Sequence, residues 1–140
     1  MPRGPLPPEL LDFVRRPQLG VIATLRPDGS PHTVATWYDL EDDGTVLVNM
    51  DASRQRLGHM RADPRVSLTV LEARNWYRHV SLLGRVVRIE DDVELVGIDR
   101  LARRYTGSPF GRRGANRVSA WIAVDSWHAW DDSGPWNPGG

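Results

Sequence analysis

A short basic segment, Ser53-Arg54-Gln55-Arg56, carries the side chains best suited to bind an anion. It follows an apolar run and precedes a polar stretch, so it lies where a predicted strand gives way to a helix. A helix N-terminus offers free backbone N–H groups, and serine and arginine add hydrogen bonds that suit a phosphate. The segment is therefore either a phosphate site or a solvated basic helix face, and its spacing alone does not separate the two.

The composition excludes several other chemistries. All 18 basic residues are arginines, so no lysine is present for Schiff-base chemistry and arginine must hold any phosphate. Cysteine is absent, which excludes disulfides and thiolate metal sites. We expect no metal site, because no ligand spacing relates the four histidines, His32, His59, His79 and His128.

The zero net charge gives no general attraction to nucleic acid or to an anionic membrane, so neither is an expected partner. The basic loop at residues 111–114 is either a phosphate loop or an ordinary surface loop. No apolar stretch approaches the roughly 20 residues of a membrane span, and the N-terminus lacks a signal core. We therefore expect a cytoplasmic protein.

A second candidate for chemistry is the stretch Thr33-Val34-Ala35-Thr36-Trp37-Tyr38. Small side chains allow a flat ring to approach a sheet closely, and Trp37 would border such a ring. An ordinary core strand explains the same residues.

Short strands with turn residues between them dominate the rest of the chain, which predicts a small antiparallel barrel. Gly84 predicts a bulge or a bend in the strand. The expected strands are 19–25, 32–40, 45–50, 65–71, 76–89, 118–124 and a short 126–130, and the expected helices are 9–16, a short one within 51–63 capped by Asp51 or Ser53, and 93–105. The 140 residues suit one domain at 9–130, after an irregular segment 1–8 and before a flexible tail 131–140.

An ordered set of motifs resembles a known family. Its strongest part is Asp28-Gly29-Ser30-Pro31-His32 followed by Asp63-Pro64-Arg65-Val66, with Ser53-Arg54-Gln55-Arg56 between them. Over about residues 11–130 the chain resembles the pyridoxamine 5'-phosphate oxidase-like split barrels. More narrowly, it resembles the actinobacterial flavin/deazaflavin oxidoreductases of the B group, which use coenzyme F420.

The resemblance implies a mainly β fold, a six- or seven-stranded antiparallel split β-barrel (the FMN-binding split barrel) with two to three short helices. It also implies a homodimer with a cofactor groove at the interface. The phosphate would meet the basic segment, and the ring would lie against the second and third strands. The implied cofactor-binding residues are Thr36, Trp37, Asn49, Met50, Ser53, Arg54, Gln55, Arg56 and His59.

Two positions depart from the family pattern. Arg56 stands where relatives often have lysine, which preserves the charge. His59 stands where relatives often have asparagine.

The function implied by the resemblance is an F420-dependent oxidoreductase that transfers a hydride between coenzyme F420 and an unknown small unsaturated substrate. One alternative is an FMN-binding flavin reductase or oxidase. Another is a non-catalytic split barrel that stores or carries a cofactor, or binds haem. The cofactor would supply the chemistry, so no covalent catalyst is expected. The catalytic residues stay unknown, with Tyr38 and His79 as candidate proton donors.

Overall fold

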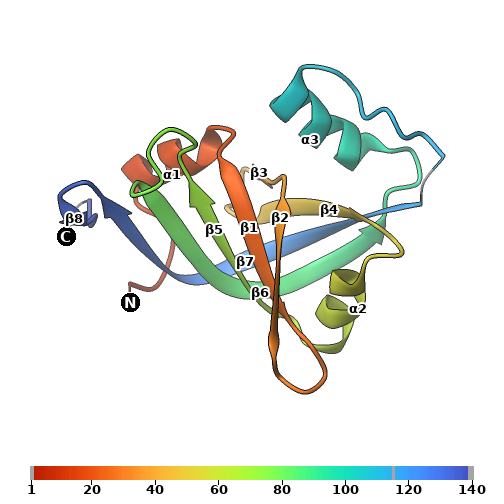
Figure 1. Cartoon of the computed structure of the whole chain (residues 1–140), viewed down its shortest axis with the longest axis horizontal. Coiled ribbons are helices and arrows are strands. Elements are labelled where there is room, and N and C mark those ends of the chain that lie inside the picture. The colour runs from red at the N-terminus through yellow and green to blue at the C-terminus, as the bar shows by residue number, and fades with distance from the viewer. Residues whose placement is uncertain (1, 115, 139–140) are drawn as a thin grey trace.

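A single antiparallel sheet organises the molecule (Figure 1). The computed structural model describes residues 2–114 and 116–138. Within these residues the sheet has eight strands in the order β2-β1-β5-β6-β7-β4-β3, with β8 paired to β7, and it is not closed. The strands are β1 (Leu19–Leu25), β2 (Pro31–Thr36), β3 (Asp39–Leu40), β4 (Val46–Asp51), β5 (Arg65–Leu71), β6 (His79–Asp91), β7 (Arg117–Asp131) and β8 (Gly134–Pro135).

Three helices within the described chain complete the fold: α1 (Pro8–Arg15), α2 (Gln55–Ala62) and α3 (Val96–Thr106). The predicted mainly β split barrel is confirmed. The strand number exceeds the expected six or seven because β3 is separated from β2 and because the two-residue strand β8 was not expected. Among the described residues, no helix has the length and hydropathy that a membrane span requires.

The core lies inside the curved sheet, where alternate strand residues point inward. Val66, Leu68 and Val70 of β5 are buried, while the residues between them are partly exposed. This two-residue period gave the bounds of β1 and β5 correctly from sequence. In β4 all five residues from Val46 to Met50 are buried, because α3 packs against the face that does not meet the core.

The long strands β6 and β7 carry most of the curvature. Their pairing register shifts between Leu83 and Gly84, which confirms the expected bulge. A Cβ at Gly84 would lie 1.9 Å from the carbonyl oxygen of Ala123, so only glycine fits there.

Four sequence expectations differ from the structure. The strand expected over 32–40 is interrupted at Trp37 and Tyr38, and residues 76–78 form a turn before β6. The strands expected at 118–124 and 126–130 are one continuous β7, since β6 pairs with it from Val118 to Trp130. Asp51 and Ser53 do not cap α2; its N-cap residue is Arg54, which makes no capping side-chain hydrogen bond.

Both chain ends contact the domain that they flank. Pro8 already belongs to α1, and Leu6 is buried. At the other end β8 pairs with β7, and Trp136 is buried edge-on against Phe13 at 5.5 Å between ring centroids. Through Trp136 the predicted tail is therefore packed on the domain. Residues 1, 139 and 140 of these two ranges lie outside the described residues.

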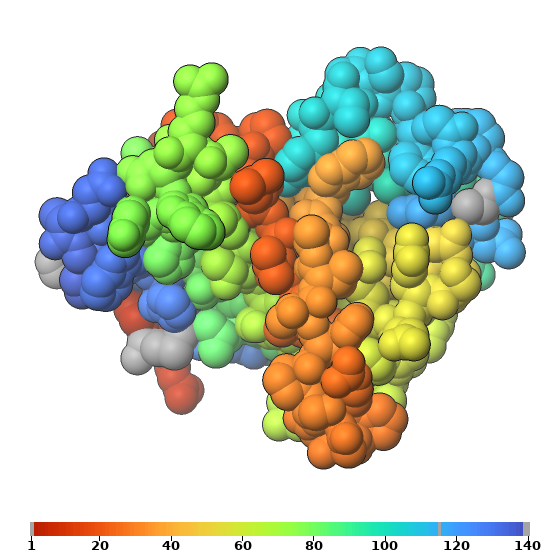
Figure 2. All heavy atoms as spheres, viewed as in Figure 1, coloured from red at the N-terminus to blue at the C-terminus, as the bar shows by residue number. Residues whose placement is uncertain are grey.

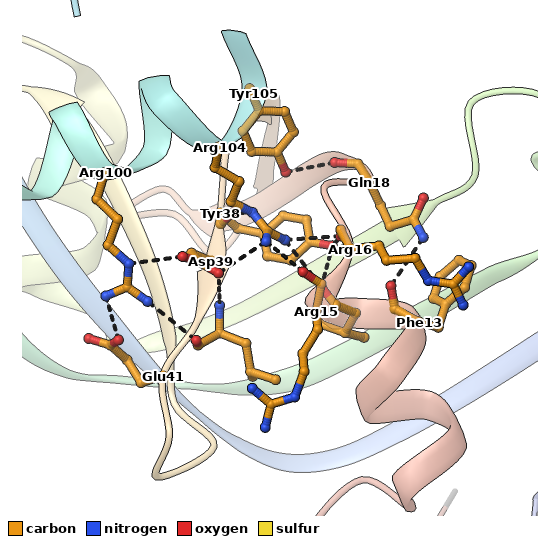
Figure 3. A network of polar contacts seen from close by, with 12 residues as sticks. Phe13, Arg15, Arg16, Gln18, Tyr38, Asp39, Glu41, Arg100, Arg104 and Tyr105 are labelled. Carbon is orange, nitrogen blue, oxygen red and sulfur yellow. Dashed lines mark hydrogen bonds and ion pairs between the residues drawn. The ribbon is translucent and has the colours of Figure 1, made fainter. Parts of the chain in front are cut away.

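A polar network anchors α3 to the rest of the molecule (Figure 3). Arg100 pairs with Asp39 at 2.8 Å and with Glu41 at 2.5 Å. Arg104 donates to the carbonyl oxygens of Tyr38 at 2.8 Å and Arg15 at 2.6 Å, and also contacts the Asp39 carboxylate at 3.2 Å. The end of α1 and the β3 segment are thereby joined to one helix.

Candidate functional site

Two adjoining cavities open between β2, β4, the start of α2 and the connection from α3 to β7. They have volumes of about 410 Å³ and about 640 Å³. Both are lined by Ala35, Arg54, Arg56 and Arg117, so we treat them as one feature, the binding groove. Figure 2 shows the surface hollowed between β2, in orange, and the yellow segment around α2. The groove therefore lies where the open sheet brings β2 and β4, which do not pair, near each other.

Four arginines line this groove: Arg54, Arg56, Arg112 and Arg117. Within the described residues, none of the four forms an ion pair with a carboxylate. Burial, with the charges of its arginine neighbours, lowers the pKa of Arg56. Burial likewise lowers the pKa of Arg117. The shared direction shows that the groove holds positive charge at a free-energy cost, which a bound anion would offset.

Arg56 is partly buried and makes a single hydrogen bond within the described residues. Its Nη2 donates to the carbonyl oxygen of Asn49 at 3.3 Å. Its Nε is buried and has no hydrogen-bond partner in the part of the chain that the structure describes. A buried donor left unsatisfied costs free energy, so the Arg56 guanidinium has hydrogen-bonding capacity that the described part of the protein does not use.

Asn49 organises the floor of the groove. Its Nδ2 donates to Asp92 Oδ2 at 3.1 Å and to Ser119 Oγ at 2.9 Å, while its Oδ1 accepts from Arg117 Nε at 3.0 Å. Asn49 thus orients Arg56 through its backbone and Arg117 through its side chain. Space here is tight, because a Cβ at Gly97 would lie 2.4 Å from Ser119 Oγ.

An apolar and aromatic wall forms the α3 end of the groove. Trp37 stacks on Tyr105, with the ring planes 8° apart and the centroids 5.6 Å apart. Phe110 meets Trp37 edge-on, and Ile98 and Leu101 of α3 also line the cavity. Thr36 lies beside Trp37 and its hydroxyl donates to the Trp37 carbonyl. This end suits a flat ring, and the arginine end suits an anion.

The remaining residues predicted from sequence separate into two groups. Ser53 and Gln55 line the larger cavity. The Ser53 hydroxyl donates to Asp51 Oδ1 at 2.7 Å, and this contact, with the Ser53 backbone N–H, lowers the pKa of Asp51. Met50 and His59 line neither cavity: Met50 has no exposed surface, and His59 Nδ1 is hydrogen-bonded to Thr24 Oγ1 at 2.9 Å.

The two candidate proton donors lie outside the groove's lining. The Tyr38 hydroxyl is fully buried and donates to the carbonyl oxygen of Val14 at 2.8 Å, and burial raises its pKa. His79 Nδ1 lies 2.9 Å from the Tyr77 carbonyl oxygen. Because a carbonyl only accepts, this nitrogen carries the hydrogen. Neither side chain is positioned to donate a proton inside the groove.

Sequence reasoning did not select Arg112 and Arg117 as site residues. Arg117 begins β7 and lies 61 positions after Arg56 in the sequence. The basic loop 111–114 was one available signal, and its Arg112 lines the groove. The described residues contain no cluster of three His, Asp or Glu side chains able to hold a metal ion.

Comparisons with known proteins agree with this fold. The chain is similar to an F420 reductase structure, with 26% identity, a TM-score of 0.76 and coverage of 91% of this chain and 98% of that one. It is also similar to a conserved hypothetical protein from Mycobacterium tuberculosis, with 29% identity, a TM-score of 0.71 and coverage of 92% and 86%.

A more distant structure, the General Stress Protein 26 from Bacillus anthracis, has 20% identity and a TM-score of 0.65 over 88% of this chain and 92% of that one, which supports the fold alone. A comparison with curated protein sequences gives no match. Residues 6–131, nearly the whole described chain, match the pyridoxamine 5'-phosphate oxidase family. The chain therefore belongs to the pyridoxamine 5'-phosphate oxidase family.

Proposed function

We propose that the binding groove holds coenzyme F420 by its phosphate and that the protein is an F420-dependent oxidoreductase. One observation carries the proposal: four arginines that have no carboxylate partner among the described residues converge in the groove, and the buried Nε of Arg56 has no hydrogen-bond partner among them either. Guanidinium groups match phosphate oxygens in geometry and charge. The similarity to an F420 reductase over most of both chains supports this cofactor.

The residues of the groove fit such a group at both ends. Arg54 and Arg56 would hold the phosphate at the start of α2, with Ser53 and Gln55 beside them. Thr36 and Trp37 would lie against the ring, and the apolar side chains of α3 would keep water from that end. Met50 and His59 would support the site from behind rather than contact the cofactor.

When bound, the deazaflavin supplies hydride transfer to or from an unsaturated substrate. The role of the protein would be to bind the cofactor and to orient it toward the substrate. The arginines would fix the phosphate, and the Trp37 wall would limit how the ring lies, which places cofactor and substrate in a reactive geometry. Since neither Tyr38 nor His79 lines the groove, the substrate's proton would come from solvent or from the substrate's own groups.

Titration of purified protein with F420, followed by fluorescence polarisation, tests the proposal. We expect binding at or below tens of micromolar, and no binding in that range would contradict it.

FMN is the main alternative, because its phosphate would suit the same arginines and the protein's family is named for an oxidase. A parallel FMN titration separates the two: tighter binding of FMN than of F420 would assign a flavin reductase or oxidase. Tight binding of F420 without turnover of any enone or quinone offered would instead favour a cofactor carrier.

We also propose that the protein forms a homodimer through the outer face of the sheet. Leu19 and Val21 of β1 are 52% and 39% exposed on that face. Val21 pairs with Ala35 on one side and Thr69 on the other, so the neighbouring surface consists of small side chains. Sedimentation should give twice the chain mass, and Val21→Arg should shift the protein toward monomer. A monomeric wild type would refute this proposal.

A further inference from the structure

The connection after α3 forms part of the groove wall although it contains no regular structure. This connection, residues 107–114, begins at Gly107, which caps α3 in a left-handed conformation. Two of them, Phe110 and Arg112, line the groove. Phe110 contacts the wall on two sides: its ring meets Trp37 edge-on at 6.4 Å, and the Arg117 guanidinium lies 4.8 Å from its centroid. The position of this connection therefore shapes both the aromatic end and the cationic end of the site.

A single carboxylate on α3 holds this connection. Asp99 Oδ1 accepts from the backbone N–H of Phe110 at 3.0 Å and pairs with Arg113 Nη1 at 2.6 Å. The Asp99 side chain is only 13% exposed, so water competes weakly for these contacts. Arg113 in turn donates to the Phe110 carbonyl at 3.2 Å. Both backbone polar groups of Phe110 are thus tied to one carboxylate–guanidinium pair.

The helix that carries Asp99 is itself fixed at both ends. Asp92 accepts from the backbone N–H groups of Gly97 and Ile98 at the start of α3. Arg100 and Arg104 anchor the rest of the helix to the β3 segment and to α1 (Figure 3). Asp99 therefore projects from a rigid platform and transmits that rigidity to an irregular segment.

We propose that Asp99 is a positioning residue of the binding groove, which holds segment 107–114 so that Phe110 and Arg112 face the ligand. This inference rests on the proposed function for its ligand and adds the element that shapes the site. Without Asp99 the segment would sample many conformations, and binding would then have to order it. The cost would appear as weaker cofactor binding although Asp99 lines neither cavity.

Two measurements on the full-length protein test the inference. The first is hydrogen exchange of segment 107–114 without any ligand. Asp99→Ala should exchange faster in this segment alone, with α3 and the sheet unchanged. Asp99→Asn should restore protection in part, because its carboxamide oxygen still accepts from the Phe110 N–H. Glu94→Ala, which removes an exposed carboxylate just before α3, is the matched control and should behave as wild type.

The second measurement is the F420 dissociation constant of the same variants. We expect about a five- to tenfold increase for Asp99→Ala, a smaller one for Asp99→Asn and none for Glu94→Ala. Wild-type exchange or wild-type affinity in Asp99→Ala would overturn the inference. If wild-type protein bound neither F420 nor FMN, the proposed function would fail, while the exchange result would still decide whether Asp99 orders the segment.

Discussion

The binding groove and the anchor of α3 both depend on arginines, and they differ in what compensates the charge. In the anchor, Arg100 and Arg104 are surrounded by carboxylates and carbonyl oxygens, with the closest contacts at 2.5–2.8 Å. In the groove, Arg56 has one hydrogen bond, to a single carbonyl at 3.3 Å, and a buried Nε without a partner in the described structure. Arginine thus stabilises the fold in one region, and in the other it has N–H donors that are free to bind a ligand.

The difference gives a physical criterion, independent of relatives, that distinguishes arginines that stabilise the fold from arginines proposed to bind a ligand. A guanidinium whose donors are all used contributes to folding, and its removal leaves buried acceptors unsatisfied. A guanidinium that faces other cations adds repulsion to the folded state and gains from an incoming anion. Substitutions in the two regions should therefore affect different measurements.

The largest expected effect is on stability, at Arg104. Its side chain is 12% exposed. It donates hydrogen bonds to three carbonyl oxygens at the end of α1 and to the Tyr38 carbonyl oxygen, and it forms an ion pair with Asp39. We expect Arg104→Met to lower the free energy of unfolding by about 3 kcal/mol, as for other broken buried networks. Urea denaturation measures this. If the free energy of unfolding fell by less than about 1 kcal/mol, Arg104 would contribute no more than an ordinary surface arginine, and the contrast between the anchor and the groove would be wrong.

The next effect is on binding, at Arg56. Arg56→Ala should weaken F420 affinity at least tenfold, since a charge-assisted hydrogen bond contributes about 1.5–3 kcal/mol. Its free energy of unfolding should change by less than about 1 kcal/mol, because lost contacts and relieved repulsion offset each other. Arg61→Ala on the exposed side of α2 is the control. Equal affinities for the two variants would move the phosphate away from Arg56.

The Asn49 network predicts an intermediate effect on both measurements. Gly97→Ala would push a methyl group against Ser119 Oγ and toward Asn49 Nδ2, 3.3 Å away. We expect about 1–3 kcal/mol of destabilisation from this overpacking, together with weaker binding through a displaced Arg117. Denaturation and F420 titration of one preparation give both values. Destabilisation with unchanged F420 affinity would show that Arg117 contributes to binding without being positioned by Asn49.

The smallest effect uses a simple anion. Millimolar inorganic phosphate should raise the melting temperature of wild-type protein by a few degrees, because a ligand that binds only the folded state stabilises it. The shift should vanish in Arg54→Ala/Arg56→Ala. The shift in melting temperature should persist in Arg100→Gln, because this substitution removes a guanidinium of the α3 anchor and none from the groove. Chloride at equal ionic strength controls for screening, and an equal shift with chloride would refute specific binding.

Local patterns were enough to predict the regular part of the fold. The strands at 19–25 and 65–71 have the predicted bounds because one buried face imposes strict alternation. The interruption at Trp37 and Tyr38 was missed, since Trp37 stacks on Tyr105, which lies 68 positions later in the sequence. The same limit explains Trp136, which is buried against Phe13 from the opposite end of the chain.

For the candidate site, the sequence by itself determined the basic segment at residues 53–56, its place between a strand and a helix, and the dependence of any phosphate site on arginine. Those features are local, because they depend on residue type and on neighbours within a few positions. Only the tertiary structure decided which arginines are unpaired, that Arg112 and Arg117 join Arg54 and Arg56, and that Met50 faces the core. Charge compensation and burial depend on contacts between distant segments, so they are settled when the open sheet brings β2, β4 and the start of β7 together.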